Sequence, residues 1–595
     1  MSSFTTRPEI TGTFGVVTST HWIATAVGMS ILERGGNAFD AAVATGFALQ
    51  VVEPHLNGAG GDLPAILYSK AQDKVEVICG QGPAPAKATI AHYLSEGLDL
   101  VPGSGLLATV IPGAFDAWML MLRDYGTLSL REVLEPAVYY AEQGHPLLPR
   151  VAETIAEMAD FFQEEWPTSA ATWLPGGAAP AAGSLFRNPV LAETWKRVIR
   201  EAEGAAGREA GIERAREAFY RGFIAEEIDA FFRSAEVMDA SDSRHKGVLT
   251  GDDLAGYRAH VEAPLAFDYH GWTVAKTGPW GQGPVLLQSL ALLKGFDLTG
   301  VDPSGPEFIH LVVEAMKLAY ADREIYYGDP KFSPVPMEHL LSAAYNDARR
   351  SLITERASYD LRPGTVPGYE DQLARSTAVI EAAGISATGV YEPTMAHLSE
   401  KRGDTVHLDI IDRWGNMISA TPSGGWLQSS PTAPGLGFQL NSRAQMFWLT
   451  EGLPSSLAPG KRPRTTLTPS LALFEGRPTL AFGTPGGDQQ DQWQLPFFLR
   501  LVHHGLNLQE AIDLPLFHTT HSPASFYPRQ RQPGHIMVER SVGPATLCEL
   551  RKRGHEVEEA EEWQIGRLTA AKREANGLLK AAATPRLMQA YAAGR

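Results

Sequence analysis

Residues 403–426 read GDTVHLDIIDRWGNMISATPSGGW. From Thr405 onward, apolar and polar residues alternate, which is the period of a β-strand with one buried face. Residues 412–416 are typical of a tight turn, because glycine and asparagine tolerate the positive φ that short hairpins require. A second short strand is expected over residues 417–421. The stretch therefore predicts a β-hairpin centred on Trp414.

The predicted hairpin brings two hydroxyl side chains together. Thr405 and Ser423 lie equally far from Trp414 in the sequence, so they should face each other across the two strands. A cross-strand pair of hydroxyls is common and structural. The alternative interpretation is a nucleophile with an orienting partner. On this stretch alone the structural interpretation is the more frequent one.

The composition is that of an ordinary globular enzyme. The chain has 595 residues, 44% apolar and 20% charged, and this length suggests roughly three or four domain-sized masses. The formal net charge is −17, and no basic stripe offsets it. We therefore expect no nucleic-acid partner.

Other features of the whole sequence indicate a cytoplasmic protein. Cys79 and Cys548 are the only cysteines and stand far apart, which argues against a disulfide framework and favours a reducing compartment. The first residues lack the basic start and apolar core of a signal peptide. No apolar run approaches the length that spans a bilayer. We expect a cytoplasmic localisation and no membrane partner.

The first part of the chain is rich in helix signals. Residues 38–52 predict a helix of small residues that suits close packing against a sheet. Residues 63–69 and 75–79 predict a hairpin, and residues 329–403 look like a long connector. After Thr405 the sequence favours short strands and glycine turns. Further helices are expected over residues 21–34, 127–143, 189–202, 211–232, 251–257 and 307–320, and a loop over residues 170–183.

Several motif candidates can be set aside. Residues 58–62, GAGGD, resemble a phosphate loop, but no Gly-Lys-Ser/Thr follows, and a packing loop or a tight turn near a catalytic centre fits better. Residues 503–504 and the pair His518 and His521 lack the spacing of a metal site and are interpreted as solvated or loop histidines. The absence of a Gly-x-Ser-x-Gly elbow disfavours an α/β-hydrolase. We expect neither a metal nor a cofactor.

Two later stretches change the interpretation of Thr405. Residues 461–470, KRPRTTLTPS, place hydroxyl side chains between prolines. Residues 480–488, LAFGTPGGD, end an apolar strand in the pair Gly486 and Gly487. Paired glycines let successive backbone N–H groups point at one spot, as a tetrahedral oxyanion requires. Taken singly, each stretch is also typical of a plain turn.

In this order with the threonine hairpin, the two stretches resemble the γ-glutamyltranspeptidase family of N-terminal-nucleophile hydrolases. The resemblance covers nearly the whole chain, and its motifs are specific in combination. The shorter motifs that carry it are GGNAFDAA (35–42), APAKA (84–88), VIPG (110–113), FYRG (219–222) and ADR (321–323).

The resemblance implies a fold and a maturation step. The fold would be of the α+β class, a four-layer αββα sandwich with strands from both parts of the chain. The precursor would cut itself between Asp404 and Thr405 into a large fragment 1–404 and a small fragment 405–595. The Thr405 hydroxyl would attack its own preceding carbonyl, and hydrolysis of the ester would free an α-amine. With a reference pKa of about 8, that amine can serve as general base for its own hydroxyl.

The same resemblance gives roles to further residues. Ser423 matches the second hydroxyl, which hydrogen-bonds the nucleophile. Gly486 and Gly487 match the oxyanion hole. Thr465 and Thr466 match a serine pair that contacts the substrate.

Four positions depart from the family pattern. Gln81 stands where an arginine grips the α-carboxylate of the substrate, and Met446 stands where an aspartate pairs with the α-ammonium. Arg443 replaces a glutamine, and Gly425 replaces an asparagine. A buried ammonium without its carboxylate partner is costly. The reaction machinery is therefore retained, while the residues that read a γ-glutamyl head are not.

We therefore expect an amide hydrolase or acylase acting on a small-molecule amide whose acyl group lacks a free amino-acid head. Arg443 and Arg464 are candidate cations for an acyl carboxylate. One alternative is a genuine γ-glutamyltransferase or glutathione hydrolase that reads the head with other residues. Another is a non-catalytic scaffold that is never processed, although the retained Thr405, Ser423 and paired glycines argue against it.

Overall fold

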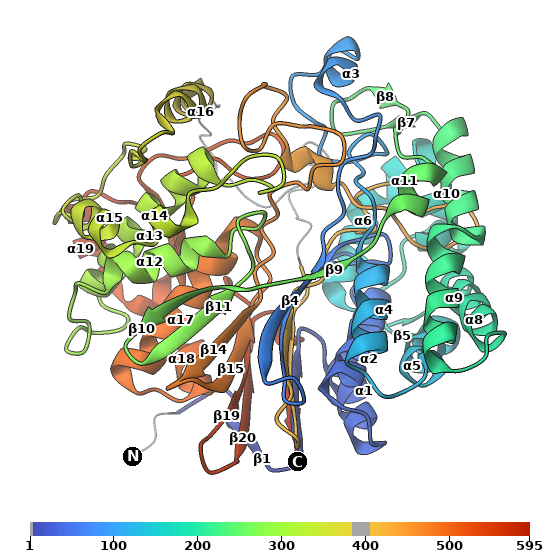
Figure 1. Cartoon of the computed structure of the whole chain (residues 1–595), viewed down its shortest axis with the longest axis horizontal. Coiled ribbons are helices and arrows are strands. Elements are labelled where there is room, and N and C mark those ends of the chain that lie inside the picture. The colour runs from blue at the N-terminus through green and yellow to red at the C-terminus, as the bar shows by residue number, and fades with distance from the viewer. Residues whose placement is uncertain (1–3, 383–404) are drawn as a thin grey trace.

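Two seven-stranded β-sheets lie face to face at the centre of the protein, and helices cover both outer faces (Figure 1). The structure is a computed structural model that describes residues 4–382 and 405–595. This architecture confirms the predicted α+β class and four-layer αββα sandwich. Helices α12 (Pro284–Leu293), α13 (Pro306–Tyr326) and α17 (Gln490–His504) lie on one outer face, and α1 (Trp22–Glu33), α2 (Ala38–Val52), α4 (Ala114–Asp124) and α5 (Leu130–Gln143) on the other.

Each sheet takes strands from both sides of Thr405. The first sheet has the order β1–β20–β19–β15–β14–β11–β10, and its strands β1, β10 and β11 precede Thr405. The second has the order β21–β2–β12–β13–β3–β4–β9, and its strands β12, β13 and β21 follow Thr405. The bounds in the first sheet are β1 (Ile10–Gly12), β20 (Leu579–Ala583), β19 (Thr569–Arg573), β15 (Arg477–Gly483), β14 (Ser470–Phe474), β11 (Trp272–Lys276) and β10 (Leu265–Tyr269). Those in the second are β21 (Tyr591–Gly594), β2 (Gly15–Ser19), β12 (Leu408–Asp412), β13 (Met417–Ala420), β3 (Leu63–Ser69), β4 (Lys74–Gly80) and β9 (His260–Glu262).

Side chains along the strand that follows Thr405 point alternately to the helical layer and to the facing sheet. Leu408 and Ile410 belong to the apolar layer that packs against α1 and α2. Ile411 belongs to the layer between the two sheets. Because side chains alternate along a strand, His407 and Asp409 face the other sheet together with Ile411. The odd-numbered side chains of this strand therefore lie in the interior of the sandwich.

Several predicted elements have the expected bounds. Helix α2 spans Ala38–Val52, and the Asn37 side chain caps it by accepting hydrogen bonds from the N–H groups of Phe39 and Asp40. Strands β3 and β4 form the predicted hairpin. Helix α11 (Gly251–Gly256) begins with a capping box.

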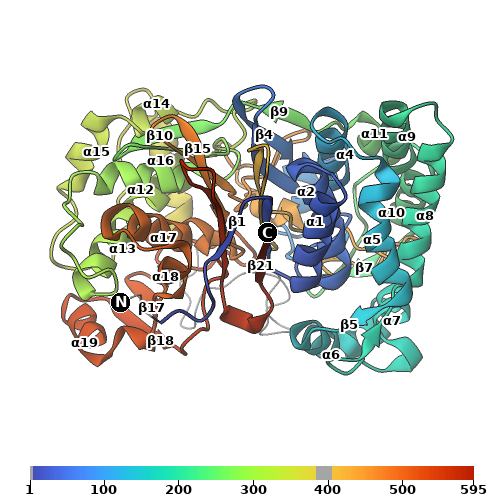
Figure 2. The same ribbon diagram turned by 90° about the horizontal axis from the view of Figure 1, so that it is seen from below.

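Other elements differ from the prediction. Residues 211–232 were expected as one helix, but α9 (Arg208–Tyr220) and α10 (Phe223–Ser234) are separate because Gly222 leaves the helical conformation between them. With α8 (Pro189–Glu203), they form an additional row outside α5 (Figure 2). The predicted loop 170–183 begins inside α7 (Pro167–Trp173). The predicted connector, residues 329–403, contains the helices α14 (Met337–Leu340), α15 (Ala343–Arg350) and α16 (Glu370–Ala382). The part of the chain after Thr405 was expected to form short strands and turns, but it also contains the helices α17, α18 (Leu508–Asp513) and α19 (Pro544–Lys552).

The sequence predicted no disulfide framework and no membrane-spanning segment. Cys79 is buried and Cys548 is exposed, and both are free thiols. Within the described ranges, no helix combines the length and the apolar character needed to cross a membrane.

Candidate active site

The hairpin forms in the predicted register. Strand β12 (Leu408–Asp412) pairs with β13 (Met417–Ala420) around the turn at Trp414. Beyond the strand ends, the same register brings Thr405 opposite Ser423, and the two residues form an antiparallel bridge. The hydroxyl of Thr405 donates a hydrogen bond to Ser423 Oγ over 3.2 Å. The predicted hydroxyl pair therefore exists in the structure.

The backbone around Ser423 is held from the side opposite Thr405. Ser423 and Asp62 exchange two backbone hydrogen bonds, of 2.8 and 3.1 Å. A side chain on Gly61 would come within 2.1 Å of the Ser423 carbonyl oxygen, so only glycine fits there. Ser423 is fully buried, and Thr405 is 2% exposed. Residues 58–62 are thus a tight packing loop beside the hydroxyl pair.

A buried polar network that the sequence did not reveal lies on the same strand as Thr405. His407 Nδ1 lies 2.8 Å from Thr421 Oγ1, and its Nε2 lies 3.0 Å from Asp409 Oδ1. The other oxygen of Asp409 accepts a hydrogen bond from Thr569 in the facing sheet at 2.7 Å. The network therefore ties the strand of Thr405, in the second sheet, to β19 of the first sheet. The alternating pattern of the sequence, which places His407 and Asp409 on one face of the strand, could have indicated this network.

The paired glycines form a turn next to this strand. Gly486 has φ +130° and Gly487 has φ +47°. The strand that leads into the turn lies against the Thr405 strand, because a side chain on its last residue, Gly483, would come within 2.2 Å of the His407 ring. Among the described residues, no acceptor is bonded to the N–H group of either Gly486 or Gly487. These groups stand at the start of the short 3-10 helix η3 (Gly487–Gln489), which leads into α17, and unsatisfied N–H groups at a helix start favour an anion.

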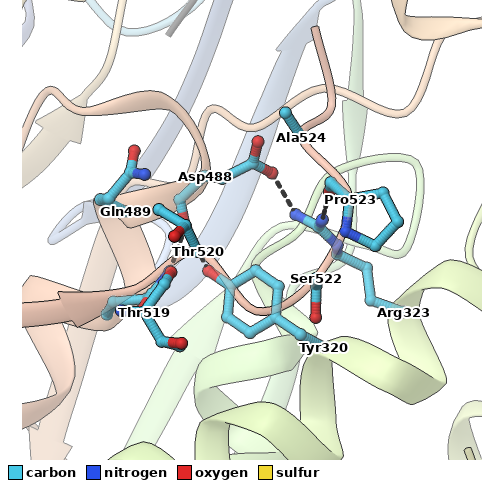
Figure 3. A pocket seen from close by; sticks show the side chains of 10 residues that line it. Tyr320, Arg323, Asp488, Gln489, Thr519, Thr520, Ser522, Pro523 and Ala524 are labelled. Carbon is cyan, nitrogen blue, oxygen red and sulfur yellow. Dashed lines mark hydrogen bonds and ion pairs between the residues drawn. The ribbon is translucent and has the colours of Figure 1, made fainter. Parts of the chain in front are cut away.

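Asp488 anchors this turn to α13 (Figure 3). Its carboxylate accepts hydrogen bonds from Arg323 at 2.5 Å and from the N–H and hydroxyl of Ser525 at 2.7 and 2.6 Å. Tyr320 donates to the Asp488 carbonyl oxygen at 2.5 Å. Burial opposes ionisation, but Arg323 and Ser525 outweigh it and lower the pKa of Asp488. The small pocket on this side is lined by Tyr320, Arg323, Asp488, Gln489, Gln492, Thr519, Thr520, Ser522, Pro523 and Ala524.

Both candidate cations are already paired with carboxylates. Arg443 Nε donates to the Asp62 carboxylate at 3.0 Å, and its guanidinium lies 5.2 Å from the centre of the Trp426 ring. Burial raises the pKa of Asp62, although the charge of Arg443 opposes the rise. Arg464 Nη2 lies 2.9 Å from Glu324 Oε1. Either guanidinium would have to share or break a buried ion pair to bind a substrate carboxylate.

Two of the three other departures from the family pattern are the uncharged side chains of Gln81 and Met446. Gln81 is buried at the end of β4, and its Nε2 donates to the Gly82 carbonyl oxygen at 3.1 Å. Its Oε1 accepts no hydrogen bond from any residue that the structure describes. Met446 packs with Trp426 and Phe526 in a small apolar cluster.

The two threonines that match the serine pair have different surroundings. The N–H of Thr465 donates to the Trp280 carbonyl oxygen at 2.9 Å, and its hydroxyl accepts from the Leu467 N–H at 3.3 Å. The buried hydroxyl of Thr466 has no hydrogen-bond partner within the described ranges. Thr466 is therefore the one whose hydroxyl is available to a ligand.

One cluster has the residue types of a metal site. Ligand atoms of Cys79, His260 and Glu262 lie within 4.8 Å of one another. However, Arg462 donates to Cys79 Sγ at 3.2 Å and to Glu262 at 2.7 Å, so a cation already occupies this group. Burial raises the pKa of Cys79 to about 11, which keeps the thiol protonated. The cluster does not fit a metal ion, whose ligands must be deprotonated.

Two histidines interpreted as solvated or loop residues are buried instead. His518 is 2% exposed and His521 is fully buried. Burial lowers the pKa of His521 to about 3. Its ring accepts a hydrogen bond from the Gly534 N–H at 3.1 Å. It therefore serves as a neutral structural side chain.

The fold and the site define a class of protein. A four-layer αββα sandwich with a buried hydroxyl pair at the start of a strand is the architecture of an amide hydrolase of the N-terminal-nucleophile type. The chain belongs to the gamma-glutamyltranspeptidase family, whose model matches residues 24–594. It is thus a γ-glutamyltransferase-like amide hydrolase, as the sequence predicted.

Curated relatives and solved structures agree with this assignment. The chain is 30% identical to the glutathione hydrolase-like YwrD proenzyme of Bacillus subtilis (strain 168), over 97% of this chain and 98% of the relative. It is 31% identical to the acylase ACY 1 proenzyme of Pseudomonas sp. (strain SE83), over 93% and 88%. The structure of LmbA2991HD matches all of both chains with 54% identity and a TM-score of 0.92. The cephalosporin acylase from Bacillus halodurans matches 100% of this chain and 98% of its own with 29% identity and a TM-score of 0.83.

Proposed function

We propose that the chain is a precursor that cuts itself between Asp404 and Thr405 and then hydrolyses amides with Thr405 as nucleophile. The observation that carries the proposal is the buried hydrogen bond from Thr405 Oγ1 to Ser423 Oγ. Relatives named proenzymes support it. Asp404 itself lies outside the described residues.

The cut is an acyl shift followed by hydrolysis. Thr405 Oγ1 attacks the carbonyl carbon of Asp404, the C–N bond breaks, and the Thr405 nitrogen takes the proton that the hydroxyl loses. Water then hydrolyses the resulting ester and returns the hydroxyl to Thr405. The products are fragment 1–404, ending in a carboxylate, and fragment 405–595, beginning with a free amine.

The same atoms then carry out turnover. The Thr405 α-amine takes the Oγ1 proton while Oγ1 attacks the substrate carbonyl, and it passes that proton to the leaving amine. The N–H groups of Gly486 and Gly487 bind the oxyanion that forms. The product of this half-reaction is an ester on Thr405, which water hydrolyses. Ser423 orients the nucleophile throughout.

The substrate that we propose is an amide whose acyl group has no amino-acid head. Gln81 and Met446 offer no charge at the two positions where the family reads an α-carboxylate and an α-ammonium. Leaving such charges buried without a partner would be costly. A relative named as an acylase is compatible with this substrate class.

The second candidate function is a genuine glutathione hydrolase or γ-glutamyltransferase. One observation favours it, since a relative that aligns with 97% of this chain is named glutathione hydrolase-like. The remaining alternative, a non-catalytic scaffold, has no such support. It would also leave the Thr405–Ser423 pair without a purpose beyond packing.

The experiment measures kcat/KM of the purified protein for several acyl anilides side by side. The panel contains glutaryl, aromatic acyl and γ-glutamyl anilides, the last with and without glycylglycine. We expect the glutaryl or an aromatic acyl anilide to be hydrolysed faster, with no acceleration by glycylglycine. A preference for the γ-glutamyl anilide, stimulated by the dipeptide, would establish the second candidate. An unprocessed chain that hydrolyses none of them would be a scaffold.

A further inference from the structure

Three buried guanidinium groups and two carboxylates, one buried and one partly buried, gather beside the glycine turn. Arg323 pairs with Asp488 at 2.5 Å and with Glu324 at 2.6 Å. Arg464 pairs with the same Glu324 at 2.9 Å. The third guanidinium, that of Arg529, forms no ion pair with any residue that the structure describes. The group therefore carries one positive charge in excess.

Arg529 is held by only one of its nitrogens. Nη2 donates to the carbonyl oxygens of Gln445 and Phe447 at 3.0 and 3.1 Å, and the guanidinium lies 4.3 Å from the centre of the Trp448 ring. Nε and Nη1 donate to no described group, although the side chain is only 2% exposed. Buried charged donors without acceptors are strongly unfavourable. These N–H groups are therefore available to an acceptor, and a negatively charged one suits them best.

The guanidinium remains charged under ordinary conditions. Burial, and then the neighbouring charge of Arg464, lower the pKa of Arg529 to about 9. Since this value is above neutrality, the side chain is mostly protonated at pH 7. An anion placed at its unbonded donors would balance the excess charge.

Arg529 contacts the segment around Met446, and neighbouring residues of its loop contact Met446 and the glycine turn. The two carbonyl groups that hold it flank Met446, the position where the family resemblance places a carboxylate for an ammonium. Phe526, on the same loop, packs against Met446. Ser525, next to it, binds Asp488 of the glycine turn. The family pattern has a carboxylate at this place in the site, whereas this chain has a guanidinium beside it.

We propose that Arg529 binds a carboxylate carried by the acyl part of the substrate, through its Nε and Nη1 donors. This inference rests on the proposed hydrolysis at Thr405 and adds the class of acyl group, namely a dicarboxylic acid monoamide such as a glutaryl or succinyl amide. A charge-assisted hydrogen bond from a guanidinium to a carboxylate is among the strongest in proteins. Unlike Arg443 and Arg464, Arg529 can make it without giving up an ion pair within the described part of the chain.

The first test needs no substitution. Glutaryl p-nitroanilide and its neutral counterpart, in which a primary amide replaces the carboxylate, have nearly the same shape. We expect the wild-type protein to favour the glutaryl compound in kcat/KM by roughly 10-fold or more. Equal values, or a preference for the neutral compound, would overturn the assignment.

The second test removes the charge. Arg529→Met should lower kcat/KM for the glutaryl anilide by roughly 10- to 100-fold and leave the neutral compound nearly unchanged. Arg531→Met, two residues further along the loop, is the matched control and should keep the wild-type preference. The melting temperature of Arg529→Met should stay the same or rise, because an uncompensated charge is gone. Equal losses for both substrates, with a lower melting temperature, would mean a structural role.

Binding of glutarate separates this inference from the proposed function. Glutarate carries the carboxylate but no scissile amide, so it reports the site without catalysis. It should raise the melting temperature of the wild-type protein and not that of Arg529→Met. If glutarate binds in this way but no anilide is hydrolysed, the proposed function fails and the carboxylate site stands. If both anilides are hydrolysed without preference, the carboxylate site fails and the function stands.

Discussion

Ser423 owes its position to its backbone, which exchanges two hydrogen bonds with Asp62, while its hydroxyl contacts Thr405. Ser423→Ala should therefore preserve the fold and lose the orientation of the nucleophile. We expect turnover to fall roughly 10²-fold and the free energy of unfolding to fall by about 1 kcal/mol. Both quantities, kcat and the free energy of unfolding, can be measured on one preparation.

Ser419→Ala is the matched control for this substitution. Ser419 is a buried serine of the same hairpin, and its hydroxyl donates to the Phe482 carbonyl oxygen at 3.1 Å rather than to Thr405. It should cost about as much stability with little loss of turnover. A stability collapse in Ser423→Ala with normal residual turnover would mean that the pair is structural.

Gly486 combines a special backbone angle with a close neighbour. Its φ is +130°, and an added Cβ would lie 2.1 Å from the Trp493 ring. Gly486→Ala should lower the free energy of unfolding by more than about 2 kcal/mol and also lower kcat. Gly476→Ala, with φ +75° and open space around it, should cost only about 1 kcal/mol. Equal losses in chemical unfolding of the two variants would contradict this account.

At the residue scale, the spacing of residues predicted the hydroxyl pair, but it did not predict which buried arginines are paired with carboxylates. Thr405 and Ser423 belong to one hairpin, so alternation and turn chemistry place them together. The partner of Arg443 is Asp62, which lies 381 residues away in the sequence. No local pattern can supply such a pairing. The unpaired state of Arg529 was hidden for the same reason, because it depends on the absence of a distant carboxylate.

At the scale of elements, helices with strong caps or wide apolar faces were predictable. Helix α2 has both, with Asn37 as its cap and every residue buried. Helix α16 has only Ser376 and Ile380 buried, so its sequence carries a weak apolar period and looked like a connector. The break at Gly222 was missed because the apolar period continues across it.

The end of α2 provides a test that depends on pH. Glu53 is fully buried there, and its carboxyl group accepts hydrogen bonds from Thr20, at 2.6 Å, and from Gln589. Burial raises the pKa of Glu53 from 4.5 to about 8, although those bonds oppose the rise. Between these values the folded state holds more protons than the unfolded chain. Stability from protonated Glu53 is therefore complete below pH 4.5 and is lost as the pH rises through about 8.

Glu53→Gln stays neutral at every pH and should remove this loss. Melting temperatures of wild type and variant, measured from pH 4.5 to 8.5 at constant salt, should diverge as the pH rises, with the wild type falling more steeply. Glu132→Gln is the control, because hydrogen bonds from Ser129 lower the pKa of Glu132. The contribution of Glu132 to stability therefore increases with pH, whereas that of Glu53 decreases. Parallel curves for wild type and Glu53→Gln would contradict the assignment.

At the scale of the whole molecule, the two parts of the chain are interleaved. Strand β12, which follows Thr405, lies between β2 and β13, and β2 comes from the first part of the chain. In the other sheet, β14 pairs with β11 across the same divide. A cut before Thr405 would leave both sheets hydrogen-bonded across the two fragments. The fragments should therefore stay together in native buffer and separate only on denaturation.

The central claim is that Thr405 cuts the chain in front of itself, and a denaturing gel with N-terminal sequencing tests it most directly. In proportion to length, the 64.4 kDa chain should give fragments of about 44 and about 21 kDa. The wild-type protein should show these two bands, with the smaller one beginning at Thr405, and Thr405→Ala should remain a single band. A fully active wild-type protein that stays in one piece would contradict the account, as would a cut at another bond.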